Sequence, residues 1–140
     1  MVRQQLNLFN RPTLNILRDV KEQMAEAHRA SGMSRDELCD LMNDLADRYG
    51  IRLLKGNGKK LSLATLDKWL NPQDKEHYPS PNAMEVFLSA TNNEGPLRAM
   101  AEPLGFMVIG EEDVRLLAWA KHYFQAKDAR KNMKKIEAEL

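Results

Sequence analysis

Apolar residues recur at intervals of three and four along most of the chain, which is the spacing of one face of an α-helix. The first such stretch, 13–30, has Thr13 as its expected N-cap. A second stretch, 34–50, opens with Ser34 and a glutamate three residues later, which is a capping-box pattern. The pattern therefore predicts two amphipathic helices, preceded by a loose N-terminal arm over residues 1–12 that has no sustained period.

The next segment, 51–61, breaks this period. Gly56 and Gly58 flank an asparagine, and glycines allow the positive φ angles of a tight reversal. The segment is predicted to form either a short hairpin or a basic loop.

A third helix is predicted over residues 62–70. Ser62 is its expected N-cap, and Leu66 and Trp69 lie three residues apart on one side. Asn71 and the proline after it end the helix.

The remaining pattern predicts a helix over 80–92, a short helix over 96–104, an extended segment over 106–109 and a long helix over 111–140. The side chains expected in the core are Leu14, Leu17, Val20, Met24, Ala27, Leu38, Leu41, Met42, Leu45, Leu66, Trp69, Leu70, Met84, Phe87 and Leu88. The chain is thus expected to be all-α, with one helical domain over 13–110 and a separate C-terminal helix.

The composition is typical of a globular protein, because 43% of the 140 residues are hydrophobic and 29% are charged. No apolar run approaches the roughly 18 residues of a membrane span, and the N-terminus has no apolar core of a secretory signal, so a cytoplasmic location is expected. The single cysteine, Cys39, lies in a helical pattern and is expected to be buried.

Sequence motifs for catalysis or metal binding are absent. The three histidines are isolated from one another and from Cys39, and no nucleotide-binding glycine motif or nucleophile motif occurs. The chain is therefore expected to be no enzyme and to bind no metal or cofactor.

The residues at 61–71, Leu-Ser-Leu-Ala-Thr-Leu-Asp-Lys-Trp-Leu-Asn, followed by Pro79, Ser80 and another helix, resemble the recognition helix and next helix of lambda-repressor-like domains. Among these, the phage CII-type regulatory proteins are the most similar. The resemblance covers 33–105 loosely and implies binding of operator DNA as a dimer. It places base-reading positions at Leu63, Ala64 and Lys68 and a phosphate-positioning hydroxyl at Ser62.

The residues themselves favour the same surface, because Ser62, Ala64, Thr65 and Lys68 are expected to face away from the core. A positive cluster directly before the helix is either a phosphate-binding wing or a solvated loop tip. Asn71 either contacts phosphate or serves as a helix-ending turn residue. The candidate DNA contacts are Arg52, Lys55, Lys59, Lys60, Ser62, Leu63, Ala64, Thr65, Lys68 and Asn71.

Three features weaken this hypothesis. The net charge is only +1, and Leu63 and Ala64 cannot make the hydrogen bonds that discriminate bases. The second helix is also longer than in the family and carries carboxylates that would repel phosphates: Asp36, Glu37, Asp40, Asp44 and Asp47. The alternative is a non-enzymatic protein-interaction module built on a helix-turn-helix scaffold.

The last helix is acidic in its first turn and basic toward its end, with Lys127, Arg130, Lys131, Lys134 and Lys135. Its strongest apolar surface is expected to pack on the domain and consists of Leu116, Leu117, Ala120, Tyr123 and Phe124. A sparse heptad register also occurs at Trp119, His122, Ala126, Ala129, Met133, Ile136 and Leu140. The helix is therefore interpreted as a homodimerisation arm, with a solvated tail as the alternative. Together these features predict a phage-type transcriptional regulator that binds duplex DNA as a dimer.

Overall fold

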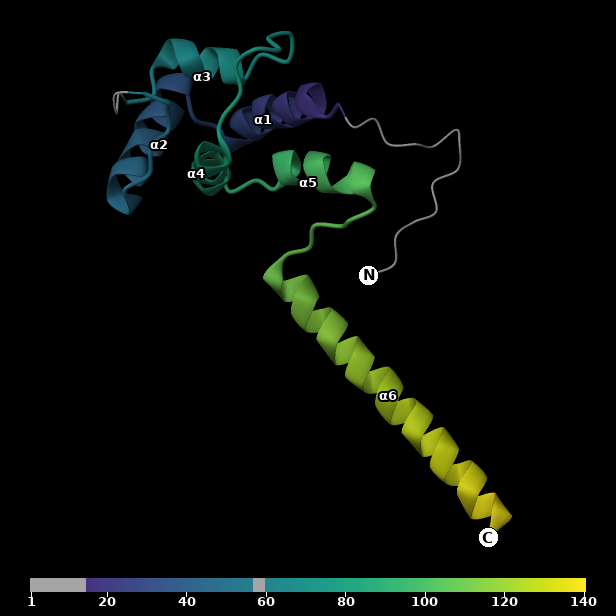
Figure 1. Cartoon of the computed structure of the whole chain (residues 1–140). Helices are drawn as coiled ribbons and strands as arrows, with labels where there is room; N and C mark the ends of the chain where they lie inside the picture. The colour runs from purple at the N-terminus through teal and green to yellow at the C-terminus, as the bar shows by residue number, and fades with distance from the viewer. Residues whose placement is uncertain (1–14, 57–59) are drawn as a thin grey trace. The chain divides into compact units, whose positions relative to one another are not determined.

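A computed structural model describes residues 15–56 and 60–140 (Figure 1). These residues form α1 (Leu17–Ser31), α2 (Arg35–Tyr49), α3 (Leu63–Trp69), α4 (Pro81–Thr91), α5 (Gly95–Ala101), a 3₁₀ turn η1 (Glu102–Leu104) and α6 (Glu111–Glu139). No strand occurs among them, so the predicted all-α class is confirmed. The chain divides into two compact units, Met1–Val108 and Ile109–Leu140.

Three predicted serine caps are confirmed. The hydroxyl oxygens of Ser34, Ser62 and Ser80 each accept a hydrogen bond from the backbone N–H three residues later, at 3.1–3.2 Å. These bonds satisfy amides that have no partner inside the helix. The three helices therefore begin within one residue of where the sequence places them.

The predicted start of α1 is wrong. Asn15 and Ile16 are not helical, so α1 begins at Leu17. Thr13, the expected N-cap, and the 1–12 arm lie outside the described residues. Of the two forms left open for 51–61, the hairpin is not supported, because 51–56 and 60–61 contain no strand. The reason is that Leu53 and Leu61 are buried and draw both ends of this segment into the core.

In the first unit, α1 packs against α5, and α2 packs against α3 and α4 (Figure 1). The buried hydrophobic residues are Val20, Met24, Ala27, Leu38, Cys39, Met42, Ala46, Leu53, Leu61, Leu66, Trp69, Leu70, Ala83, Val86 and Phe87. Five predicted core residues, Leu17, Leu41, Leu45, Met84 and Leu88, are only half-buried, and Leu14 lies outside the described residues. The smaller side chains of Ala46 and Ala83, which were not predicted to be in the core, are buried.

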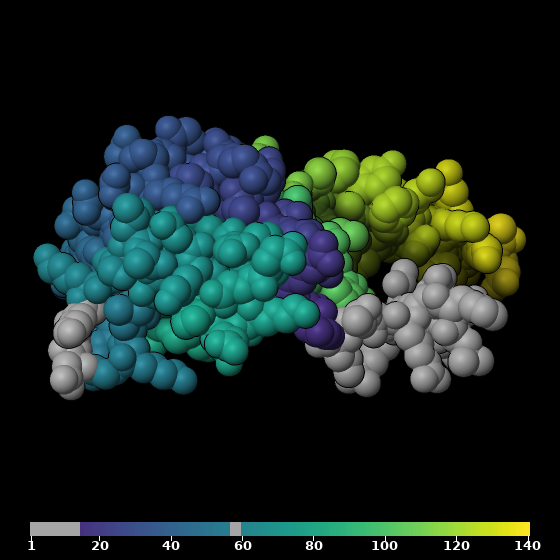
Figure 2. Space-filling model, turned by 90° about the horizontal axis from the view of Figure 1, so that it is seen from above, coloured from purple at the N-terminus to yellow at the C-terminus, as the bar shows by residue number. Residues whose placement is uncertain are grey.

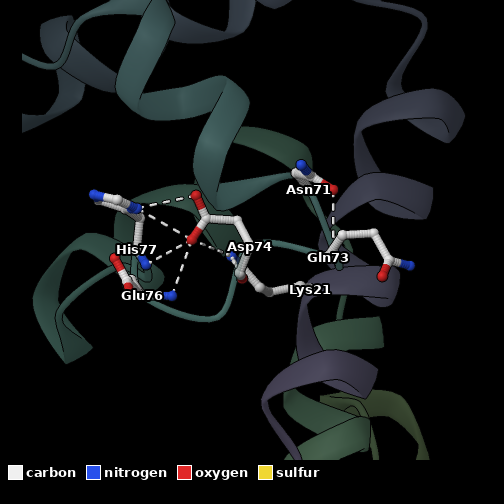
Figure 3. A network of polar contacts seen from close by, with 6 residues as sticks. All are labelled: Lys21, Asn71, Gln73, Asp74, Glu76 and His77. Carbon is white, nitrogen blue, oxygen red and sulfur yellow. Dashed lines mark hydrogen bonds and ion pairs between the residues drawn. The ribbon is translucent and has the colours of Figure 1, made fainter.

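A polar network joins α1 to the connection after α3 (Figure 3). The side chain of Lys21 is fully buried, and its Nζ donates a hydrogen bond to the backbone carbonyl of Asp74. The same Nζ lies 3.9 Å from Asp74 Oδ1. Burial lowers the pKa of Lys21, while the carboxylate of Asp74 partly opposes this shift.

Asp74 organises the turn that contains it. Its Oδ1 accepts hydrogen bonds from the backbone N–H groups of Glu76 and His77, each at 2.9 Å, and the His77 ring lies 3.0 Å from Oδ2. The hydrogen bond from the His77 amide, with further help from Glu76 and the His77 ring, lowers the pKa of Asp74 to about 2.

No helix in the described part of the chain combines the length and apolarity that crossing a bilayer requires.

The depressed pKa of Asp74 predicts acid sensitivity of the first unit. The ordinary pKa is 3.8, so the stabilisation from Asp74 is complete above about pH 4 and is lost as the pH falls toward 2. In Asp74→Asn, the free energy of unfolding should fall less between pH 4 and pH 2 than in the unaltered chain. Urea unfolding followed by circular dichroism at several pH values measures this difference.

Asp44→Asn is the matched control, because Asp44 is an exposed carboxylate on α2. An identical loss of stability on acidification in the Asp74→Asn variant and the unaltered chain would contradict the role assigned to Asp74.

Candidate nucleic-acid interface

The helix α3 is only 7 residues long, so contacts with the rest of the unit hold it in place. Leu66 is fully buried and Trp69 is 3% exposed, so this side faces the core as predicted. At its start, Ser62 Oγ accepts from the Thr65 amide and donates to Thr65 Oγ1 at 3.0 Å. The helix is thus fixed along one side and capped at its first turn.

The residue before this cap is bound to α2 by a side-chain amide. Asn43 Oδ1 accepts from the Leu61 N–H at 2.9 Å, and Asn43 Nδ2 donates to the Leu61 carbonyl at 3.0 Å. Leu61 is 3% exposed, so water cannot replace these bonds. The long connection between α2 and α3 is therefore pinned at its second end, a contact that sequence reasoning missed.

Cys39 strengthens the same contact. Its Sγ donates to the Leu61 carbonyl at 3.2 Å, and the side chain is buried, as predicted. Burial raises the pKa of the Cys39 thiol, and the carboxylates of Asp40, Asp36 and Asp67 add to the effect. The thiol accordingly stays protonated and remains a donor.

The structure divides the predicted α3 contacts into two groups. Ser62, Leu63, Ala64 and Lys68 are exposed on the side opposite the core, whereas Thr65 is half-buried. Leu63 is 39% exposed, so the surface carries an apolar side chain next to the hydroxyl and the ammonium group. The outward face of α3 is thus narrower and less polar than the sequence suggests.

The positive residues before α3 can be placed in part. Arg52, Lys55 and Lys60 are exposed, and Arg52 Nη1 donates to the Gly56 carbonyl at 3.2 Å. Lys59 lies outside the described residues. Two exposed lysines, Lys55 and Lys60, therefore precede α3 in the sequence, and the Arg52 side chain binds the backbone of its own loop.

A hollow of about 730 Å³ lies between the 52–56 segment, α3 and the 76–81 segment. Arg52, Lys55 and Thr65 are among the residues that line it. Glu76 and His77 line the same hollow, so its charge is mixed.

Asn71 is placed as a turn residue. Its Oδ1 accepts from the Gln73 N–H at 3.0 Å, an arrangement typical of an Asx turn (Figure 3). A phosphate contact from Asn71 would depend on its amide nitrogen and stays a prediction.

Sequence reasoning gave no role to Asp67 on α3. Its Oδ1 lies 2.6 Å from Nη1 of Arg35, at the start of α2, in a half-exposed ion pair. This pairing offsets a carboxylate beside Lys68 that would otherwise oppose an anionic ligand. Arg35 and Asp67 are 32 residues apart, so no local pattern in the sequence predicts this ion pair. The only sign of it is that the two residues have opposite charges.

Exposed side chains of α2 and α3 have different charges. Both helices contribute to the face seen in Figure 2. On α2 five carboxylates are exposed, those of Asp36, Glu37, Asp40, Asp44 and Asp47. The first unit therefore presents a mixed surface rather than a uniformly positive one.

No group of three metal-ligating side chains occurs within the described ranges. Comparison of the chain with models of known protein families, with curated proteins and with solved structures finds no match.

The Asn43 contact predicts that α3 loosens without it. Asn43→Ala leaves the Leu61 N–H without its side-chain partner and leaves the Leu61 carbonyl with the Cys39 thiol as its remaining side-chain donor, which costs about 1–3 kcal/mol of unfolding free energy. Hydrogen exchange of the Leu61 amide should accelerate. Urea unfolding and exchange measured by NMR test both effects.

Asp44→Ala, which alters the exposed next residue on α2, is the control and should leave both quantities almost unchanged. Unaltered protection of the Leu61 amide in Asn43→Ala would show that the contact does not hold α3.

Proposed function

We propose that this chain is a phage- or prophage-type transcriptional regulator that binds duplex DNA as a homodimer, with α3 in the major groove. The observation that carries the proposal is the fixed orientation of α3. Leu66 and Trp69 hold one side in the core, and Ser62 and Lys68 are left on the opposite, exposed side. A recognition helix uses this arrangement to insert its outer side chains into the groove.

The charged residues near α3 support a role in phosphate binding. Lys55 and Lys60 are exposed before the helix, and Arg35 offsets the carboxylate of Asp67 on the helix itself. Lysines that neutralise phosphates release counterions, which gives affinity without sequence preference. Lys68 then supplies the strongest hydrogen-bond donor on the outer side of α3 for a base edge.

The apolar Leu63 and Ala64 would contribute differently. Such side chains contact thymine methyl groups but make no bidentate hydrogen bonds, so each specifies a base weakly. A second copy would compensate, because two linked sites raise affinity without any new contact. This is the reason for including a homodimer in the proposal.

A second function is favoured by the exposure of Leu63 and by the exposed carboxylates of α2. An apolar side chain bordered by negative charge suits the surface of a protein partner. In this alternative, α3 is part of a scaffold for protein interaction, and the chain has no affinity for duplex DNA.

Salt dependence of duplex binding separates the two functions. Fluorescence anisotropy with a labelled duplex should show affinity that weakens as salt rises from about 50 mM. In Lys55→Ala/Lys60→Ala, the slope of log K against log salt should shrink by about 2, because each lost phosphate contact contributes roughly 0.9.

Lys75→Ala is the matched control, since Lys75 is an exposed lysine of the same unit, in the connection after α3. It should keep the slope of the unaltered chain. Absence of any salt-sensitive duplex binding at micromolar protein in low salt would refute the DNA proposal and favour the protein-binding alternative.

A further inference from the structure

The first half of α6 carries a cluster of large apolar side chains in solvent. Leu116, Leu117, Tyr123 and Phe124 are each between 50% and 63% exposed. Trp119 stacks on Tyr123 with ring centroids 5.5 Å apart, and Tyr123 contacts Phe124 edge-on at 5.6 Å. The packing on the domain predicted for this cluster stays a prediction.

The cluster surrounds a small residue. Ala120 follows Leu116 by four residues and precedes Tyr123 and Phe124 by three and four, so all of them share one face of the helix. An alanine at the centre of such a face lets a second helix approach closely. We call the face formed by Leu116, Leu117, Ala120, Tyr123 and Phe124 the aromatic face.

Charge is arranged unequally around this face. Asp113 lies seven residues before Ala120 and Lys127 seven residues after it, so both fall on the same side, two turns away in opposite directions. Beyond Lys127 the same side continues with Lys131 and Lys134. The aromatic face is therefore bordered by a carboxylate at one end and by ammonium groups at the other.

We infer that the aromatic face pairs with the same face of a second copy in the antiparallel direction, with the two Ala120 residues opposite each other. In this register Leu116 lies opposite Phe124 of the second copy, and Leu117 lies opposite its Tyr123. Asp113 lies opposite Lys127 at both ends, so the two ion pairs flank a continuous apolar contact.

The parallel direction is unfavourable for the same charges. It would place Lys127, Lys131 and Lys134 against their own copies and Asp113 against Asp113. Like charges repel across such a seam. In the antiparallel register, Lys131 and Lys134 lie just past the N-terminal end of α6 of the second copy. The first turn of that helix carries the carboxylates of Glu111 and Glu112.

The sparse heptad register does not provide an alternative continuous seam. By helical geometry, Ala129, Met133 and Ile136 lie roughly 140–180° around the helix from Ala120, the centre of the aromatic face. Contact is therefore limited to the first half of α6. This inference concerns α6 alone and does not depend on DNA binding.

Sedimentation of the full chain without DNA tests the surface. The unaltered chain should sediment as a dimer at micromolar concentration, and Leu116→Glu should raise the dimer dissociation constant by about tenfold or more. Ala118→Glu adds the same charge on the opposite, exposed side of α6 and should leave the dimer intact. Both residues are exposed, so neither change disturbs folding.

Disulfide formation tests the direction. A size-tagged chain with Asp113→Cys is mixed with an untagged chain with Lys127→Cys, and the mixture is oxidised. In the antiparallel heterodimer the two cysteines lie opposite each other, and the other Asp113–Lys127 ion pair is retained. Antiparallel pairing predicts a disulfide between the two different chains, whereas parallel pairing predicts disulfides only between like chains. Cys39 is buried, so the unaltered chain treated alike is the control.

A disulfide between unlike chains, together with dissociation of Leu116→Glu alone, would support the inference. Like-chain disulfides, a monomeric unaltered chain, or equal effects of Leu116→Glu and Ala118→Glu would each overturn it. Because no DNA is present, these outcomes bear on the homodimer in the proposed function and leave duplex binding to its own salt-dependence test.

Discussion

The position of α3 depends above all on the contact between the Asn43 amide and the backbone of Leu61. The connection from α2 has no regular secondary structure, so nothing local determines the direction in which α3 begins. One side chain that satisfies both the N–H and the carbonyl of a buried residue fixes two points of the backbone at once. The outward direction of Lys68 follows from that constraint, because Leu66 and Trp69 can then enter the core from only one side.

The far end of α3 is held by a different kind of polar contact. Asp74 orders the turn through the amides of Glu76 and His77, and the buried Lys21 binds the Asp74 carbonyl from α1. A buried ammonium group needs such partners, because desolvation otherwise disfavours it. Directional contacts at both ends and apolar packing between them give α3 a single orientation, which packing alone would specify less sharply.

The sequence predicts those features whose cause lies within a few residues. The serine caps of α2, α3 and α4 and the buried side of α3 depend on neighbours three or four positions away, and these predictions are confirmed. Asn43 and Lys21 contact residues 18 and 53 positions distant, and no local pattern marks them. The choice between a hairpin and a loop for 51–61 could not be made from the sequence for a related reason. Glycines permit a reversal, but burial of Leu53 and Leu61 decides the path of the backbone.

The same distinction applies to α6, whose helical structure is predictable from local spacing although its pairing is not. The aromatic face and the sparse heptad register lie on roughly opposite sides of α6, so one helix–helix contact cannot bury both. The charges that border the aromatic face favour the antiparallel direction of pairing. Self-association would matter most for a surface such as that of α3, which offers few hydrogen-bond donors. In the proposed DNA-binding dimer, linking two weak α3 sites through α6 would raise their effective concentration and strengthen binding without any further contact to the DNA.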